Sequence, residues 1–252
     1  MRRPCGPLTA VRNPRAGLRS HRVVHVSPRI MGYPRSMWLL CPPGVYRPQD
    51  DTLLLEDALK REPLTAEADV LDLGTGTGAL ALTAAEHGVA RVTAVDASVG
   101  AVLTTWLNAR LNRLRVRVLR GDLTAPVTDR RFDLIMANPP YVPSPRARPP
   151  GRGRAVAWDA GPDGRVLLDR ICSDAPPLLT PGGVLLLVHS GFCGVEHTLG
   201  RLRRAGLRPV VTDRRYIPFG PVLRGRSAWL EARGLISPGE EKEELVVIRA
   251  ER

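Results

Sequence analysis

The chain has 252 residues, of which 43% are hydrophobic, and a formal net charge of +12. This length suits one sizeable hydrophobic core with at most a small extension. No apolar run approaches the roughly 18 residues that a membrane-spanning helix needs, so we expect no association with a membrane.

The positive charge is concentrated at the N-terminus. Residues 1–36 contain eight arginines and no acidic residue, which leaves only +4 for the rest of the chain. Because they show no helical or strand period, we expect a basic, disordered extension there. A transit peptide or a nucleic-acid-binding arm has a similar composition, and Met31 and Met37 are alternative start sites. We expect residues 37–252 to form a single domain, whose mild charge argues only weakly for nucleic-acid binding.

The cysteines and histidines indicate neither a metal site nor a disulfide framework. The four cysteines lie far apart and form no CxxC pair, and the five histidines show no ligand-like spacing. We therefore expect no bound metal and a reducing compartment, the cytoplasm.

Order should begin near Trp38, and residues 44–48 should form a loop. Asp50 or Asp51 is predicted to cap the helix that follows, which carries several leucines. The segment around Tyr46 is a candidate lid over a cofactor.

From residue 69 the chain alternates strands and helices. Strands are expected at about 69–73, 91–95, 115–119, 132–137, 184–188, 208–213 and 245–248. Helices are expected from Ala79, from Ser98 to about Arg113, at 164–176 and at 194–205. The pattern predicts an α/β fold with one doubly wound, Rossmann-like sheet of seven mostly parallel strands, the last antiparallel.

Three irregular features accompany these elements. The helix from Ser98 presents five large apolar side chains on one face: Val102, Leu103, Trp106, Leu107 and Leu111. Residues 142–163 form a loop rich in Pro, Arg and Gly. Residues 218–240 form an extra hairpin or loop before the last strand, which either adds substrate surface or is merely tolerated.

A glycine-rich turn follows the first strand of the alternating region. Asp72, Gly74, Gly76 and Gly78 have the spacing DxGxGxG, and glycine allows φ > 0 and close approach of the backbone to a ligand. Asp96 ends the next strand, where an acid can accept hydrogen bonds from both hydroxyls of a ribose. These four residues and Asp96 are therefore candidate cofactor ligands.

Asp122 is a further candidate cofactor ligand, because Gly121-Asp122 ends the third strand. A helix cap or a solvated turn explains this residue about equally well.

The strand at 132–137 ends in Asn138-Pro139-Pro140-Tyr141, a rigid corner because both prolines fix φ and lack an N–H. An amide or exocyclic amine is a poor nucleophile, since its lone pair is delocalised. The Asn138 side-chain oxygen and the Pro139 carbonyl would accept its two N–H groups, and Tyr141 would stack on the planar group. Such a reaction needs positioning and no metal.

These roles assign catalysis to Asn138, Pro139 and Tyr141 and substrate contact to Asn138, Pro140 and Tyr141. Asn138 is also expected to reach the cofactor. If the two strands are neighbours in a parallel sheet, the glycine turn and this corner open at the same carboxyl edge, where such sheets bind ligands.

Together the two turns, Asp96 and Gly121-Asp122 resemble the class I S-adenosylmethionine-dependent methyltransferases of the HemK type. Residues 44–55 and 158–169 resemble the short, single-domain HemK2/Mtq2-like branch, and the similarity spans about 38–250. The resemblance implies S-adenosylmethionine as cofactor, with Asp96 on its ribose, Asp122 on its adenine and the turn at 74–78 on its methionine end. It also implies N5-methylation of a glutamine in a translation release factor.

The resemblance implies partners as well. The longer bacterial enzymes carry an N-terminal domain that docks their substrate, and we expect too few residues before Asp72 to build one. The short branch of eukaryotes and archaea works with a small zinc-binding activator subunit.

Two other functions remain open. A nucleic-acid methyltransferase acting on adenine N6 or guanine N2 could use the same corner, and four arginines beside the site favour it: Arg146, Arg148, Arg152 and Arg154. Such enzymes take the base out of its stack and usually need extra recognition surface, of which the rest of the sequence shows no sign. The non-enzymatic alternative is an S-adenosylmethionine-binding interaction protein. The intact corner at 138–141 argues against this alternative.

Overall fold

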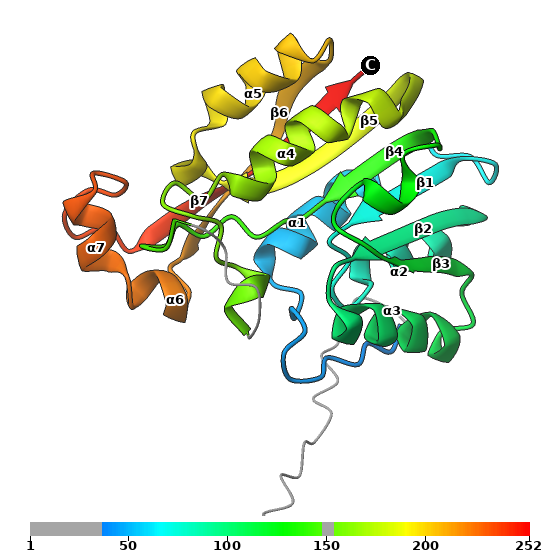
Figure 1. The fold of residues 1–252 in the computed structure, drawn as a ribbon, viewed down its shortest axis with the longest axis horizontal. Coiled ribbons are helices and arrows are strands. Elements are labelled where there is room, and N and C mark those ends of the chain that lie inside the picture. Colours follow the sequence, from blue (N-terminus) through cyan, green and yellow to red (C-terminus); the bar gives the residue numbers. More distant parts are fainter. Residues whose placement is uncertain (1–36, 148–153) are drawn as a thin grey trace, which may run out of the picture.

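The computed structural model describes residues 37–147 and 154–252 (Figure 1). The basic extension predicted for residues 1–36 therefore lies outside the described residues, as do Arg148 and Arg152. In the described part of the chain, none of the helices has the length and apolar character that a membrane span requires.

The seven strands form one sheet in the order β3-β2-β1-β4-β5-β7-β6. They are β1 (Asp69–Leu73), β2 (Arg91–Asp96), β3 (Val116–Arg120), β4 (Phe132–Ala137), β5 (Leu179–Ser190), β6 (Arg208–Pro218) and β7 (Lys242–Glu251). Strand β7 is antiparallel to both of its neighbours, and the other pairs are parallel. The predicted fold class is confirmed.

Helices cover both faces of the sheet (Figure 1). Helices α1 (Asp50–Leu59), α2 (Ala79–Glu86) and α3 (Val99–Leu111) lie on one face, and α4 (Val166–Asp174) and α5 (Val195–Arg204) lie on the other. The central strands are largely apolar because both of their faces are covered. In β1, for example, Val70, Leu71 and Leu73 are fully buried.

The last strands extend well beyond their predicted bounds. The sequence predicted strands at 208–213 and 245–248, whereas β6 and β7 pair from Arg208 opposite Glu251 to Pro218 opposite Lys242, with one register shift between Val211 and Asp213. Along β6 exposed residues alternate with more buried ones, which suits an antiparallel hairpin with one exposed face. The apolar runs alone did not reveal this extension.

The segment between β6 and β7 is helical, so the predicted hairpin or loop is wrong in detail. It contains α6 (Pro221–Arg224) and α7 (Ser227–Ala232) at the tip of the β6–β7 hairpin. Its own hydrophobic cluster consists of Phe219, Leu223, Leu230 and Ile236. The loop expected at 142–163 is present, with a short 3-10 helix at Arg154–Ala157 and with residues 148–153 outside the described part.

Helix α3 begins after the Ser98 cap and turns its small and polar side chains, not its large apolar ones, toward the sheet. Its buried residues are Ala101, Thr104, Thr105, Asn108 and Ala109. Large side chains do not fit there, since a Cβ on Gly78 would already lie 2.8 Å from Thr105 Cγ2. Most of the predicted apolar row is therefore exposed to solvent, with Leu103 61% and Trp106 50% accessible.

Candidate functional site

The glycine turn and the Asn-Pro-Pro-Tyr corner leave the sheet side by side. Strands β1 and β4 are parallel neighbours, with Leu73 opposite Ala137. Gly74 and Asn138 follow these two residues directly, so both turns open at the carboxyl edge of the sheet. The predicted adjacency of the two motifs is confirmed.

All three glycines of the turn have left-handed backbone, with φ of 73° at Gly74, 58° at Gly76 and 88° at Gly78. A Cβ built on Gly74 would meet no atom within 4 Å, so this part of the backbone borders open space. Gly78, in contrast, packs tightly against α3. The turn thus offers an accessible backbone at its first glycine and a fixed anchor at its third.

Asp96 lies against the glycine turn. One carboxyl oxygen accepts a hydrogen bond from Gly76 N at 2.9 Å, and the other accepts one from Ser98 N at 2.8 Å. Burial raises the pKa of this carboxyl, and the two backbone hydrogen bonds partly offset the effect. Both N–H groups fix the carboxylate at the mouth of the turn, at the end of β2.

Asp72 lies beneath the turn and is fully buried. Its Oδ2 accepts a hydrogen bond from the Thr75 hydroxyl at 2.5 Å, whereas Oδ1 has no partner among the described residues. Burial raises the pKa of Asp72 to about 7. From this position the side chain braces the turn from below.

Asp122 stands apart from the other candidate ligands. Its carboxyl is exposed and pairs with Arg170 of α4 through two contacts, of 2.9 and 3.1 Å. Within the described ranges its side chain makes no hydrogen bond to the glycine turn or to Asp96, although the N–H of the neighbouring Gly121 donates to Asp96 O at 3.0 Å. Its role at an adenine stays a prediction.

Tyr46 connects the two turns. Its backbone oxygen lies 3.7 Å from the position that a Cβ on Gly76 would take, and its hydroxyl donates to Asp51 Oδ2 at 2.6 Å. The Tyr141 hydroxyl donates to the same oxygen at 3.0 Å. Burial is the main reason that the pKa values of both phenols are raised. The segment predicted as a lid therefore lies beside both the glycine turn and the Asn-Pro-Pro-Tyr corner.

The predicted capping role of Asp50 or Asp51 is wrong. Gln49 occupies the N-cap of α1, without a side-chain cap hydrogen bond. Asp51 lies in the first helical turn and is buried, and two phenol hydroxyls hold its carboxyl there.

A cavity of about 600 Å³ opens at the Asn-Pro-Pro-Tyr corner. Its walls come from the start of α1, residues 138–142, the 3-10 helix region and the β6–β7 hairpin with its helical tip. Three carboxyl groups line it, from Asp50, Asp51 and Glu243, and no lysine or arginine does so among the described residues. The cavity at the corner is thus lined by acidic side chains, although the chain as a whole is basic.

Glu243 is an unusual member of this lining. It is buried on β7, and its Oε2 has no hydrogen-bond partner among the residues that the structure describes. Burial raises the pKa of its carboxyl to about 7; the nearby Ser190 side chain partly offsets this effect, and the charge of Asp51 adds to it. In its protonated form such a carboxyl can donate as well as accept a hydrogen bond.

The helical segment at 219–241 closes one side of the cavity. Pro218 and residues 220–223 line it. The segment is held by Arg226, which donates to Pro143 O at 2.8 Å and to the buried carboxyl of Asp159 at 2.6 Å. The sequence left two interpretations of this segment, an added substrate surface or a merely tolerated insertion. Its position in the wall of the cavity favours an added substrate surface.

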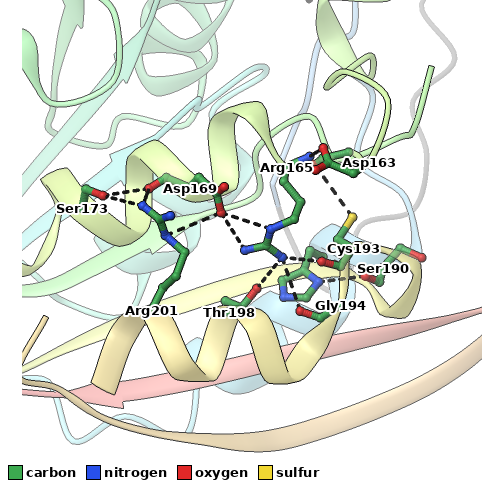
Figure 2. Close-up of polar contacts among 11 residues, drawn as sticks. Asp163, Arg165, Asp169, Ser173, Ser190, Cys193, Gly194, Thr198 and Arg201 are labelled. Atoms are coloured by element: carbon green, nitrogen blue, oxygen red, sulfur yellow. Dashed lines mark hydrogen bonds and ion pairs between the residues drawn. The ribbon is translucent and has the colours of Figure 1, made fainter. Parts of the chain in front are cut away.

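The stretch at 158–169 supports the corner from behind. A Cβ on Gly164 would lie 2.2 Å from the carbonyl oxygen of Tyr141, so only glycine fits there. Cys193 Sγ donates to the same carbonyl at 3.2 Å. Figure 2 shows how the buried Arg165 reaches from the start of α4 to the carbonyls of Cys193 and Gly194. This cluster fixes the corner relative to α5.

Several residues of the site were missed by sequence reasoning. Asp51 and Thr52 follow Tyr46 closely in sequence, but their shared position beside Tyr141 depends on the packing of α1. Glu243 lies in an acidic run that is typical of an exposed surface, and the sequence holds no signal for its burial.

Comparison with known proteins gives the class. The fold and the paired turns are those of a class I methyltransferase, and residues 37–148 match the family model described as "Methyltransferase small domain". The chain belongs to the HemK family. It is 34% identical, over 70% of its length and 88% of the relative's, to a putative protein N5-glutamine methyltransferase of Methanocaldococcus jannaschii. It is 36% identical to mouse methyltransferase HEMK2, over 65% of this chain and 80% of that one.

Solved structures agree on the fold. The Mtq2–Trm112 complex from E. cuniculi, described as responsible for methylation of the translation termination factor eRF1, aligns with a TM-score of 0.57 and 25% identity. This alignment covers 83% of the present chain and 99% of that one. A 16S rRNA guanine-N2 methyltransferase of T. thermophilus, in complex with AdoMet and guanosine, aligns with a TM-score of 0.56 and 26% identity, covering 85% and 47% of the two chains.

Proposed function

We propose that this protein is an S-adenosylmethionine-dependent protein-(glutamine-N5) methyltransferase that acts on a release-factor-like protein. The observation that supports it is the acidic cavity at Asn138, which lies next to an open glycine turn. The names of the relatives point to the same reaction.

The residues at the carboxyl edge fit the cofactor. S-adenosylmethionine would supply an electrophilic methyl group on a sulfonium. The open backbone at Gly74 leaves room for its methionine end, and Asp96 would accept hydrogen bonds from its ribose hydroxyls. Asp122 is assigned to the adenine by resemblance alone.

The corner fits a planar amide as acceptor. The Asn138 side-chain oxygen and the Pro139 carbonyl would accept the two N–H groups of the amide, which orients its nitrogen and returns electron density to it. Tyr141 is held by Asp51 and, with Pro140, forms the wall for the planar group. Positioning of this kind supplies much of the rate enhancement in transfers that need no strong base.

A nucleic-acid substrate is the second candidate. The similarity to the rRNA methyltransferase and the position of Arg146 near the corner favour it. The three carboxyl groups of the cavity favour a peptide amide over a phosphodiester, since like charges repel in a partly buried site. We therefore rank the protein substrate first.

We further propose that a small activator subunit covers α3, as the Mtq2–Trm112 complex suggests. The exposed row on α3 lies beside the free edge of β3, which can pair with a further strand. Arg110, Arg113 and Arg117 line a groove beside Trp106 of this row, so the partner should present an apolar surface with an acidic rim. Such an enzyme would work in the cytoplasm, in line with the cysteine usage.

Labelling with tritiated cofactor tests the substrate class. The full-length protein is incubated with cell extract, and the labelled material is digested with nuclease or with protease. We expect label that survives nuclease and is lost with protease, and N5-methylglutamine after complete enzymatic digestion. The reverse pattern would identify nucleic acid as the substrate.

Asn138→Ala tests the role of the corner. We expect cofactor affinity to stay close to that of the wild type in calorimetry, while single-turnover methyl transfer falls by about 10²–10³, as when one oxyanion-hole partner is removed. Arg146→Ala serves as the control and should leave protein methylation unchanged. Unchanged transfer by the Asn138 variant would contradict the assignment.

A further inference from the structure

The orientation of the Asn138 amide decides whether the corner can work. An asparagine side chain has an acceptor end and a donor end of nearly equal shape. If the donor end faced the cavity, it would oppose the N–H groups of an incoming amide. Something in the protein must therefore select which end faces the substrate.

The contact of Asn138 with Thr52 is the relevant one. Asn138 Nδ2 donates to Thr52 Oγ1 at 3.1 Å. Thr52 lies in the first turn of α1 and is only 4% exposed. Within the described ranges, the oxygen of the Asn138 amide receives no hydrogen bond, and the residue lines the cavity.

The Thr52 hydroxyl donates its proton to Asp51 and not to Asn138. Thr52 Oγ1 donates to Asp51 Oδ1 at 3.2 Å. The other oxygen, Asp51 Oδ2, already accepts from the hydroxyls of Tyr46 and Tyr141. A carboxylate can only accept hydrogen bonds, and a bond to a charged acceptor is roughly twice as strong as a neutral one. The hydroxyl therefore points its proton at Asp51.

The hydrogen bond from Thr52 to Asp51 determines the direction of the bond between Thr52 and Asn138. A hydroxyl has one proton, so Thr52 can only accept from Asn138. Asn138 must then turn its NH₂ group toward Thr52, which leaves its oxygen for the substrate. The hydrogen bonds therefore converge on Asp51. The two phenols donate to its Oδ2, and Asn138 donates to Thr52, which in turn donates to Oδ1.

We propose that Thr52 is a positioning residue that selects the acceptor orientation of the Asn138 amide. This role rests on the proposed function, because it matters only if Asn138 accepts hydrogen bonds from the methylated group. No contact of Thr52 itself with the substrate is needed.

Thr52→Val and Thr52→Ser test the role in the full-length protein. Valine keeps the shape and removes the hydroxyl, so we expect kcat for a glutamine-containing release-factor peptide to fall on the order of 10- to 100-fold, with cofactor affinity unchanged. Serine should restore most of the turnover. Thr104→Val is the matched control, a buried hydroxyl on α3 that bonds only Gly100 O, at 2.7 Å, and it should leave kcat unchanged.

A double-mutant cycle separates positioning from general stability. If Thr52 acts through Asn138, Thr52→Val should cause no further loss of kcat in the Asn138→Ala background. Additive losses, or full turnover in Thr52→Val alone, would overturn the proposal.

A spectroscopic measurement keeps the test independent of activity. The Asn138 Nδ2 protons should exchange slowly with solvent in ¹⁵N-labelled wild type and Thr52→Ser, and faster in Thr52→Val. A wild type that fails to methylate glutamine would refute the proposed function and leave this comparison intact. Equal exchange in all three proteins would refute the role of Thr52.

Discussion

At the scale of single residues, Asp72 has the most consequential environment. It is fully buried beneath the glycine turn, with a pKa raised from 3.8 to about 7 by burial. The folded protein therefore binds a proton there more tightly than the unfolded chain does. The resulting stabilisation is complete below about pH 4 and is lost as the pH rises through about 7.

Asp72→Asn tests this linkage. The neutral amide keeps an acceptor for Thr75 and removes the charge. We expect the free energy of unfolding of the variant, relative to wild type, to rise between pH 5 and pH 8 by an amount on the order of 1–4 kcal/mol. Denaturant titration at several pH values measures it, with the exposed Asp129→Asn as control. A difference that does not vary with pH would show that Asp72 is not buried in this way.

At the scale of elements, the helical segment between β6 and β7 is the clearest addition to the sheet. It has its own small hydrophobic cluster. The ion pair of Arg226 with Asp159 joins it to the loop at residues 142–163. The β6–β7 ladder extends to Pro218 opposite Lys242, so it does not depend on the helices at its tip. Because the ladder does not depend on these helices, we expect the segment to be removable without unfolding the sheet.

Replacement of residues 221–236 by a short Gly-Ser linker tests its function. We expect a folded protein with unchanged cofactor affinity, and a KM for the release-factor substrate that rises about tenfold or more because a wall of the cavity is lost. Steady-state kinetics measures it. Arg233→Ala, an exposed change in the same segment, should leave KM unchanged. An unaltered KM in the deletion would mean that the segment is merely tolerated.

The elements differ in how far sequence alone predicted them. Strands β1 and β4 were found nearly to the residue, because both faces of a central parallel strand are buried and most of each run is apolar. The apolar face of α3 was also predicted from its helical period. Such a period shows which side chains share a face, but it does not show whether that face packs against the sheet or is exposed to solvent. Here the close approach at Gly78 and Thr105 decided the matter, and that contact joins two distant segments. The partners of Asp51 and Glu243 depend on tertiary packing in the same way.

At the scale of the whole molecule, the described core needs little of the chain before residue 38. Met37 and Leu39 pack with Ala79, Leu82 and Ala109. The backbone of Leu40 is held by the Asn108 side chain through two hydrogen bonds, of 2.9 and 3.1 Å. We therefore propose residues 37–252 as a single folding unit.

Two truncations test this boundary. Removal of residues 1–36 should leave Tm and methyl transfer unchanged, because no described core residue is lost. Removal of residues 1–41 should lower Tm by roughly 5 °C or more, since two buried apolar side chains and the bonds to Asn108 disappear. Thermal unfolding by circular dichroism measures both. Equal Tm values for the two truncations would contradict the boundary.

The position of Tyr46 has a thermodynamic consequence. Its backbone adjoins the place assigned to the cofactor, and its hydroxyl shares a carboxylate with the wall of the acceptor cavity. A ligand that shifts this residue from one side changes the fit on the other. By reciprocity, the factor by which the cofactor alters the affinity for the acceptor equals the factor by which the acceptor alters the affinity for the cofactor.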